Sequence, residues 1–434
     1  MADNIEPTNI EEQRTWAEVG GLEADYFNGD YPDTSSHRSL TAGLLPEQAA
    51  PVFNAGSPQE LRALWVTRWD YHTAEDVRTI ADRAADANFN ALYFQVRGNA
   101  DALYRSRIEP WSALLTGTLG GDPGWDPLET AVHEAHSRGL ELHAWVNVYP
   151  AWLGETPPTP STPVQMFDSF NQLYEDEWVM WNRHQEPMAL SKEYLWSNPA
   201  HFAVLEQIVA VGHDIIQRYY VDGLHLDNVR YASWEYSRDP ITLAEVEEAQ
   251  AVDPSVDRKE WQRRQVNTLV SRLRQAIDST KPGLLLSAAV WPVYQDIWEW
   301  WTAGDGYEGF CQDSVGWIGQ QAADLISPML YLSSITSDDA QFAALVSDFV
   351  ERAGGDHVAA GITATYDTFD PIARRIDITR QAGCAGQAIF AYGHVNEKRY
   401  WEEFRRGPYA TPATVLIPES SRARTSAMLK MAGD

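Results

Sequence analysis

The feature that most restricts the fold of this chain is a regular alternation of short apolar runs with helical segments, which begins at Leu61. The runs have the length of strands, and the segments between them show helical periodicity with capping residues or Gly stops. The predicted strands are 62–67, 91–96, 140–148, 223–226, 284–290, 327–332, 358–364 and 386–392. The predicted helices are 73–87, 127–138, 199–218, 258–279, 318–325, 340–353, 371–382 and 394–404. Eight such repeats predict an α/β fold, a (β/α)8 TIM barrel. An open doubly wound sheet is the alternative, but no GxGxxG follows the first strand.

The segments that flank the repeat lack its pattern. We interpret residues 1–58, rich in Pro, Ser, Thr and acidic residues, as an N-terminal extension, 59–405 as the barrel and 406–434 as a C-terminal tail. An elaborated loop, residues 150–198, follows the third strand and is crowded with Trp, Tyr and Phe. These rings either wall the barrel mouth, where their faces could stack on sugars, or form a small lid core.

Composition excludes several classes of partner. The formal net charge of −29, from 33 basic and 62 acidic residues, repels nucleic acid, and no apolar run approaches the ~18 residues that span a membrane. The acidic, Lys-poor composition suits a salty medium, although a biased genome composition explains it equally well. Cys311 and Cys384 are predicted at opposite ends of the barrel, too far apart for a disulfide. The start of the chain shows no secretory signal, so we expect a cytoplasmic protein unless a signal was trimmed.

The loops after the strands of such a barrel build its active site, and Asp227 follows the fourth predicted strand. A helix cap or a structural ion pair is the alternative role for this acid. Further candidates, all at predicted strand ends, are assigned to substrate binding: Asp70, Arg97, His143, Asn147, Tyr149, His225, Asn228, Arg230, Trp291, Tyr331 and Tyr392. Aromatic rings combined with Asn, Arg and Asp are typical of carbohydrate sites, because sugars offer flat CH faces and many hydroxyls.

Hydrolysis of a glycosidic bond requires two carboxyl groups. We predict that Asp227 is the nucleophile or base, kept ionised by the positive character of His225 and Arg230. Its predicted partner is Asp313, in the loop after the fifth strand, held protonated in an apolar pocket. A helix cap is the alternative role for Asp313, and Glu308 and Asp70 are the reserve acids.

Other chemistries lack their motifs. His133 and His136 are three residues apart, whereas the HExxH zinc motif needs a spacing of four. The chain has no GxSxG elbow, no GxxxxGK[ST] loop and no zinc-spaced Cys set, so neither a metal nor a cofactor is predicted. A lyase or isomerase of small phosphorylated molecules would want a Gly-rich phosphate cup after the last two strands, and the sequence offers little of it.

Several long segments resemble the glycosyl hydrolase-like 10 family of bacterial (β/α)8 proteins. The resemblance lies in residues 91–150, SNPAHFAVLEQIV (197–209), YVDGLHLDNVRY (220–231), QDSVGW (312–317), SPMLYL (327–332) and the last strand. It implies a glycoside hydrolase acting on a poly- or oligosaccharide, and some members act on the glycan strands of bacterial cell walls. The alternative is a barrel that kept carbohydrate binding and lost turnover.

The chain departs from this family in two places. Members tend to have NPYR after strand three, where this chain has Asn147-Val148-Tyr149-Pro150, and a second acid after the strand-four Asp, where it has Asn228. The positions of His225 and Asp227 also resemble alpha-amylase-like enzymes, in which a basic residue accompanies the nucleophile. Family-18 chitinases end their strand-four motif in an acid where this chain has Val229, which argues against substrate-assisted chemistry at this strand.

Overall fold

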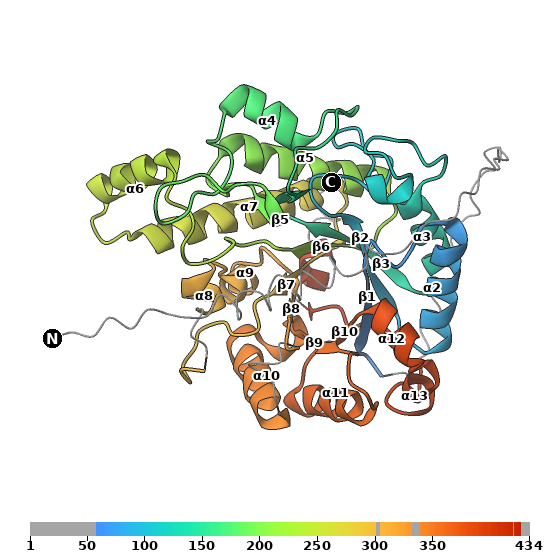
Figure 1. Cartoon of the computed structure of the whole chain (residues 1–434). Coiled ribbons are helices and arrows are strands. Elements are labelled where there is room, and N and C mark those ends of the chain that lie inside the picture. The colour runs from blue at the N-terminus through green and yellow to red at the C-terminus, as the bar shows by residue number, and fades with distance from the viewer. Residues whose placement is uncertain (1–57, 301–303, 332–337, 420, 427–434) are drawn as a thin grey trace. The chain divides into compact units, whose positions relative to one another are not determined.

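The structure is a computed structural model that describes residues 58–300, 304–331, 338–419 and 421–426. Its centre is one sheet of eight parallel strands in the order β8-β7-β6-β3-β2-β1-β10-β9. The strands are β1 (Leu61–Val66), β2 (Ala91–Arg97), β3 (Glu141–Asn147), β6 (Gly223–Asp227), β7 (Leu285–Val290), β8 (Leu325–Pro328), β9 (Ala359–Thr363) and β10 (Gly386–Phe390). A parallel bridge between Ile326 and Val358 joins the two ends of the sheet, so the strands form a (β/α)8 barrel as predicted (Figure 1).

Helices surround the strands (Figure 1). The α-helices are α2 (Ala74–Asp86), α3 (Pro127–His136), α4 (Met166–Tyr174), α5 (Phe202–Arg218), α6 (Pro240–Val252), α7 (Arg258–Thr280), α8 (Gly306–Gly309), α9 (Ser314–Gly319), α10 (Asp339–Ala353), α11 (Asp370–Ala382), α12 (Tyr392–Lys398) and α13 (Trp401–Arg406). The described residues also contain two 3-10 turns, η2 (Ala113–Leu115) and η3 (Gly355–His357). Local sequence explains several ends: Thr73 and Asp76 form a capping box before α2, and Gly383 ends α11 in the left-handed conformation.

Three predicted boundaries are corrected. The sixth barrel strand is β8, two residues earlier than expected, and it ends at Pro328, which has no N–H for the ladder. Its preceding helix, α9, is accordingly earlier than the predicted 318–325. The last predicted helix is two helices, because Arg399 adopts a left-handed φ of 60° between α12 and α13. Residues 1–57 of the predicted extension and Leu332 lie outside the described residues.

The loop after β3 carries its own small structure. An antiparallel pair, β4 (Pro150–Gly154) and β5 (Ser191–Trp196), lies beside the helix α4. Trp178 is completely buried there, packs edge-on against Phe167 and Phe170, and donates its indole N–H to Asn171. Part of the aromatic loop is therefore a lid core, which was one of its two predicted roles.

The barrel interior is filled in layers set by the strand register. Trp145 of β3 is paired with His225 of β6, and Asn147 is paired with Asp227 one layer nearer the carboxyl ends. Trp65 and Tyr93 join Trp145 in the apolar cluster inside the barrel. The interior is thus a packed core below the level of Asp227.

The chain end returns to the barrel. Thr414 pairs with Gln59, and Val415–Ile417 pack against the same interior cluster. Beyond them, Ser421 Oγ donates a 2.5 Å hydrogen bond to buried Asp324, directly before β8. The predicted tail is therefore, in its described part, packed on the amino ends of the strands.

Both cysteines are free, Cys311 buried and Cys384 partly buried, in agreement with the prediction. In the described part of the chain, no helix is long and apolar enough to cross a membrane. The same part contains no group of three or more His, Cys, Asp or Glu side chains arranged to hold a metal ion.

Candidate active site

Asp227 is the last residue of β6 and lies beside Asn147, the last residue of β3. The backbone of Asn228 has a φ of 53°, a conformation that Asn tolerates better than most residues, and it turns the chain directly after the strand. Its N–H donates a 2.6 Å hydrogen bond to Asp227 Oδ1. Asn147 and Asp227 are therefore neighbours at the same end of the barrel, as the predicted architecture requires.

Burial raises the pKa of Asp227, against the opposing effects of the Asn228 N–H, the Arg230 charge and the Trp145 side chain. Tyr331 lies near enough for the charge of Asp227 to add to the burial that raises the pKa of its hydroxyl. A raised pKa favours the protonated carboxyl group. Of the two side chains predicted to keep Asp227 ionised, Arg230 does lower the pKa of Asp227, but burial outweighs its effect.

His225 does not supply positive charge to this site. The Trp65 indole, which can only donate, gives a 3.1 Å hydrogen bond to His225 Nε2, so the ring proton is on Nδ1 and is donated to Ser287 Oγ at 2.8 Å. The ring is completely buried and stacks on Tyr93 with centroids 3.9 Å apart. Burial lowers its pKa well below the ordinary range. His225 is thus a neutral core residue, which corrects its predicted substrate-binding role.

Arg230 lies among three aromatic rings. Its guanidinium carbon is 5.0 Å from the Trp196 ring centroid, 5.2 Å from that of Trp291 and 5.0 Å from that of Phe310. The side chain donates to the Tyr231 carbonyl at 3.1 Å and, more weakly, to Asn228 Oδ1 at 3.4 Å. Burial lowers the pKa of Arg230 to about 10, which leaves the group positively charged at neutral pH. Trp196 belongs to the aromatic loop that was predicted either to wall the barrel mouth or to form a lid core, whereas Phe310 was not among the predicted site residues, since it comes from a segment far from Arg230 in sequence.

The loop after β3 also reaches the end of β1. Tyr194 of β5 accepts a 2.9 Å hydrogen bond from Arg68 Nη2, and the Arg68 guanidinium stacks over the Trp69 ring at 4.2 Å. The backbone N–H of Arg68 donates to Gln95 Oε1 at 3.0 Å. Gly98 makes room for this arginine, because a Cβ there would lie 1.8 Å from its Nη1. The aromatic loop therefore forms a wall beside the strand ends as well as its own core.

Trp291 and Tyr331, both predicted to bind substrate, lie near Arg230 and Asp227 respectively. Trp291 is 1% exposed and packs on Phe310 with centroids 3.6 Å apart, beneath the Arg230 guanidinium. Tyr331 stacks on Phe390 at 5.0 Å and meets Trp65 edge-on at 6.2 Å. Their rings provide the apolar surroundings of Asp227 and Arg230.

Asn147 and Tyr149 are close to fully buried. Asn147 Oδ1 accepts a 3.3 Å hydrogen bond from Gln95 Nε2. The Tyr149 hydroxyl is buried and makes no hydrogen bond with any described residue, and burial raises its pKa. Substrate contact by these two residues and by Asn228 stays a prediction.

Arg97 has a structural position that the sequence did not indicate. Its Nε and Nη2 bind Glu109 at 2.7–3.1 Å, and both side chains are 1% exposed. Its Nη1 donates to the carbonyls of Asn147 and Val148. Since these contacts occupy all three guanidinium nitrogens, the predicted substrate-binding role is replaced by support of the end of β3.

His143 lies two layers below Asn147, inside the barrel and completely buried. Its Nε2 is 3.1 Å from Glu141 Oε2, and a Cβ at the facing Gly223 would lie 2.2 Å from its Nδ1. His143 is therefore a core residue that packs against Gly223 of β6, which corrects its predicted contact with substrate.

Asp70 and Tyr392 connect strand ends to the helical layer. Asp70 Oδ2 accepts hydrogen bonds from the Thr67 N–H at 2.7 Å and the Thr67 hydroxyl at 2.9 Å. Burial raises the pKa of Asp70 to about 6, against the effect of hydrogen bonds from Thr67 and Gly393. Tyr392, at the start of α12, accepts a 3.1 Å hydrogen bond from Arg83 of α2. These contacts give both residues structural partners, and their predicted sugar-binding roles stay predictions.

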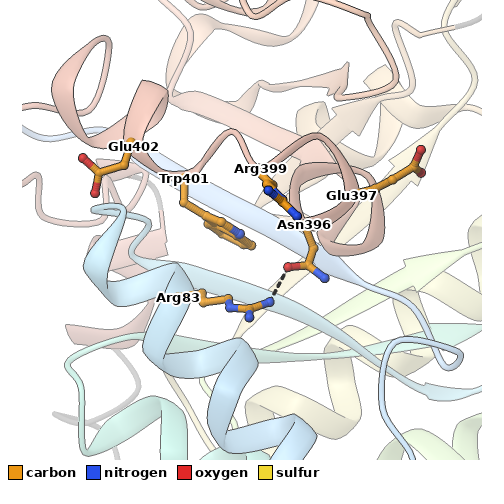
Figure 2. Close-up of a pocket in the computed structure, with 6 residues that line it drawn as sticks. All are labelled: Arg83, Asn396, Glu397, Arg399, Trp401 and Glu402. Atoms are coloured by element: carbon orange, nitrogen blue, oxygen red, sulfur yellow. Dashed lines mark hydrogen bonds between the residues drawn. The ribbon is translucent and has the colours of Figure 1, made fainter.

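Arg83, the α2 residue that donates to Tyr392, also lines a groove of about 610 Å³ (Figure 2). Its walls come from α2, α12 and α13, and Arg83 reaches across it to hydrogen-bond with Asn396. The groove thus belongs to the outer helices.

Asp313 has the helix-capping geometry that was its alternative role. Its Oδ1 accepts from the N–H of Gly316 in α9 at 3.1 Å and from the Tyr294 hydroxyl at 2.8 Å. Asn267 of α7 lies 3.5 Å from its Oδ2, and a groove of about 590 Å³ along α7 is lined in part by Asp313. The prediction of Asp313 as the catalytic partner is corrected, because its carboxylate caps α9 and faces Asn267 of α7.

Glu308 is likewise turned towards α7. It pairs with Arg263 at 3.3 Å and with Lys259 at 3.8 Å. Within the described ranges, no hydrogen bond or ion pair joins Asp227 to Asp313, Glu308 or Asp70. Of the two predicted catalytic acids, Asp227 is the one that lies at a strand end, whereas Asp313 caps α9.

Comparison with known proteins agrees with this architecture. The family model described as Glycosyl hydrolase-like 10 matches residues 60–356. Glycosyl hydrolase YngK of Bacillus subtilis (strain 168) is 28% identical over 313 residues, which are 68% of this chain and 58% of YngK. Glycosyl hydrolase DigH of Escherichia coli (strain K12) is 27% identical over 311 residues, 65% of this chain and 67% of DigH. The chain thus spans about three fifths to two thirds of the length of these relatives.

Two solved structures share the fold at low sequence identity. The PgaB (BpsB) glycoside hydrolase domain from Bordetella bronchiseptica has a TM-score of 0.59 and 14% identity, covering 80% of this chain and 98% of that one. The catalytic domain of beta-amylase from Paenibacillus polymyxa has a TM-score of 0.52 and 11% identity, covering 78% and 94%. Because the family model covers most of the barrel, the chain belongs to the glycosyl hydrolase-like 10 family.

Proposed function

We propose that this protein hydrolyses O-glycosidic bonds of a poly- or oligosaccharide, with Asp227 as the reacting carboxyl group. The observation that carries the proposal is an acid with a raised pKa at the end of a barrel strand, beside an arginine held by Trp196, Trp291 and Phe310. Trp and Tyr rings next to directional polar groups suit sugar recognition. Membership of a glycosyl hydrolase-like family and the named relatives support the reaction class.

We propose the role of proton donor for Asp227, a role that suits a carboxyl group at a strand end whose pKa is raised by burial. Hydrolysis adds one water across the bond, with the hydroxyl going to the anomeric carbon and a proton to the leaving oxygen. A carboxyl group that holds its proton closer to neutral pH can supply that proton. As pH rises through the raised pKa, the donor is lost, so the rate is expected to fall on the alkaline side.

The test is a screen of bacterial cell-wall and storage polysaccharides for new reducing ends. Asp227→Asn is expected to reduce turnover by at least ~100-fold, because it removes the proton donor and keeps the shape. The matched control is Asp222→Asn at the amino end of the same strand, where the carboxylate binds His136 and the Leu142 N–H. This control is expected to lower stability and to keep activity per folded molecule. Unchanged turnover in Asp227→Asn would overturn the assignment.

A second candidate function is a carbohydrate-binding barrel without turnover. The observation in its favour is that the predicted partner acid Asp313 caps α9, and that the reserve acid Glu308 pairs with Arg263 and Lys259 of α7. Glycan binding by the wild type, with no new reducing ends on any polysaccharide in the screen, would select this candidate over hydrolysis.

A further inference from the structure

Arg230 is a nearly buried cation, 9% exposed, at the strand ends. Asp227 is the acid whose charge acts on it, yet the two make no hydrogen bond or ion pair, and no other described carboxylate pairs with Arg230. By contrast Arg97, the last residue of β2, is bound by Glu109 through two nitrogens. Burying a cation is unfavourable unless something compensates for the lost water. The cost of holding Arg230 in this position therefore calls for an explanation.

The three aromatic rings stabilise the charge and fix the plane of the guanidinium. They offer no acceptor in that plane. Nη1 and Nη2 each donate one hydrogen bond, to the Tyr231 carbonyl and to Asn228 Oδ1, and Nε donates none within the described residues. Nε has no partner among the described residues and is not fully buried, so its N–H reaches solvent, and Nη1 and Nη2 each keep one N–H beyond the bond that they make. The Arg230 guanidinium is thus held in a fixed orientation near Asp227, and some of its N–H groups make no hydrogen bond with the described residues.

We propose that Arg230 determines specificity by binding the carboxylate of an acidic sugar residue in the subsite next to Asp227. This inference rests on the proposed function and names its substrate class. The planar fork of arginine matches the two oxygens of a carboxylate, whereas a neutral sugar would use single N–H donors and leave the charge uncompensated. The single charge of a carboxylate is also matched by the single charge of Arg230, whereas a doubly charged phosphate would leave one negative charge uncompensated.

The net charge of the protein restricts the class of acidic glycan that it is expected to bind. A net charge of −29 opposes the approach of densely charged polyanions. A glycan with an occasional acidic residue meets less repulsion and still offers one carboxylate to one arginine. The ligand we infer is therefore a mainly neutral glycan with single acidic sugars, rather than a uniformly charged polymer.

The experiment measures binding by titration calorimetry, which does not require turnover. Two probes distinguish the sources of the carboxylate: an oligosaccharide with one uronic acid residue, and a cell-wall oligosaccharide with one muramic acid residue. Each is compared with its carboxyl-reduced form. The wild type is expected to bind at least one acidic form about 10- to 100-fold more tightly than its reduced form.

Variants then test the residue. Arg230→Gln is expected to abolish the preference for the acidic form, and Arg230→Lys to keep only part of it, because lysine keeps the charge and loses the fork. The matched control is Arg263→Gln: the Arg263 guanidinium also stacks on a tyrosine, 4.0 Å from the Tyr307 ring, but pairs with Glu260 and Glu308 along α7. This control is expected to keep the preference. Circular dichroism checks that each variant is folded.

Equal binding of acidic and reduced forms by the wild type, or no binding of either acidic form, overturns the proposal, and this comparison requires no variant to fold. Selective, Arg230-dependent binding without hydrolysis would refute only the proposed hydrolysis. Cleavage of acidic and reduced forms at equal rates would refute only the role of Arg230.

Discussion

The burial of the Arg97–Glu109 ion pair allows us to predict how much its loss would lower the free energy of unfolding. Both side chains are 1% exposed, and three hydrogen bonds of 2.7–3.1 Å join them. Arg97 also holds the carbonyls at the end of β3, and the Val148 N–H donates a 2.8 Å bond to the Asp227 carbonyl. Glu109→Leu would leave the Arg97 charge buried without a partner.

The expected loss follows from the burial of both groups. Removing one partner of a buried ion pair costs ~3–5 kcal/mol in the free energy of unfolding, because the other charge remains uncompensated. Replacing both residues, as in Arg97→Met with Glu109→Leu, removes the charges together. The double variant then loses chiefly the hydrogen bonds to two carbonyls, each contributing ~0.5–1.5 kcal/mol, or more where a charge donates. It is expected to be more stable than Glu109→Leu alone.

Urea unfolding followed by tryptophan fluorescence measures these differences, provided the slope with urea stays equal among variants. A double-mutant cycle then gives the coupling energy of the pair. A loss below ~1 kcal/mol for Glu109→Leu, or additive losses in the double variant, would show that the pair is not a buried ionic support.

Two other predictions concern residues near the strand ends. The folded-state pKa of Asp70, about 6, lies above its ordinary value of 3.8, so the stability linked to this group is fully present below pH 3.8 and is lost as pH rises through about 6. The free energy of unfolding should fall by up to ~3 kcal/mol across this window, and the fall should be smaller in Asp70→Asn. Urea unfolding at several pH values measures it. The same dependence on pH in the wild type and the variant would contradict the prediction. Gly98→Ala is expected to displace the Arg68 guanidinium from Tyr194, since the new Cβ would lie 1.8 Å from Nη1, and to lower stability by ~1–3 kcal/mol; a crystal structure with Arg68 unmoved would refute this.

The sequence was sufficient for the barrel and for the position of Asp227, because strand periodicity and chain order determine which residues end a strand. It was insufficient for charge states. The neutrality of His225 depends on Trp65 and Ser287, which come from two other strands. The setting of Arg230 depends on Trp196 and Phe310, both more than 30 residues away. Asp313 shows a third limit, since the same residue type caps a helix or catalyses, and only its contacts with Gly316 and Asn267 distinguish the two.

The pairing of the first barrel strand with the last has a consequence for folding during synthesis on the ribosome. Leu61 of β1 is in register with Gly386 of β10, 325 residues later in the chain. At ~5–20 residues per second, a ribosome needs roughly 16–65 s to make that stretch. Throughout this time one edge of β1 has no partner from its own chain, and such an edge can pair with other chains. We therefore expect that synthesis in the cell favours a late, concerted closure of the barrel, and that fragments ending before β10 are prone to aggregate.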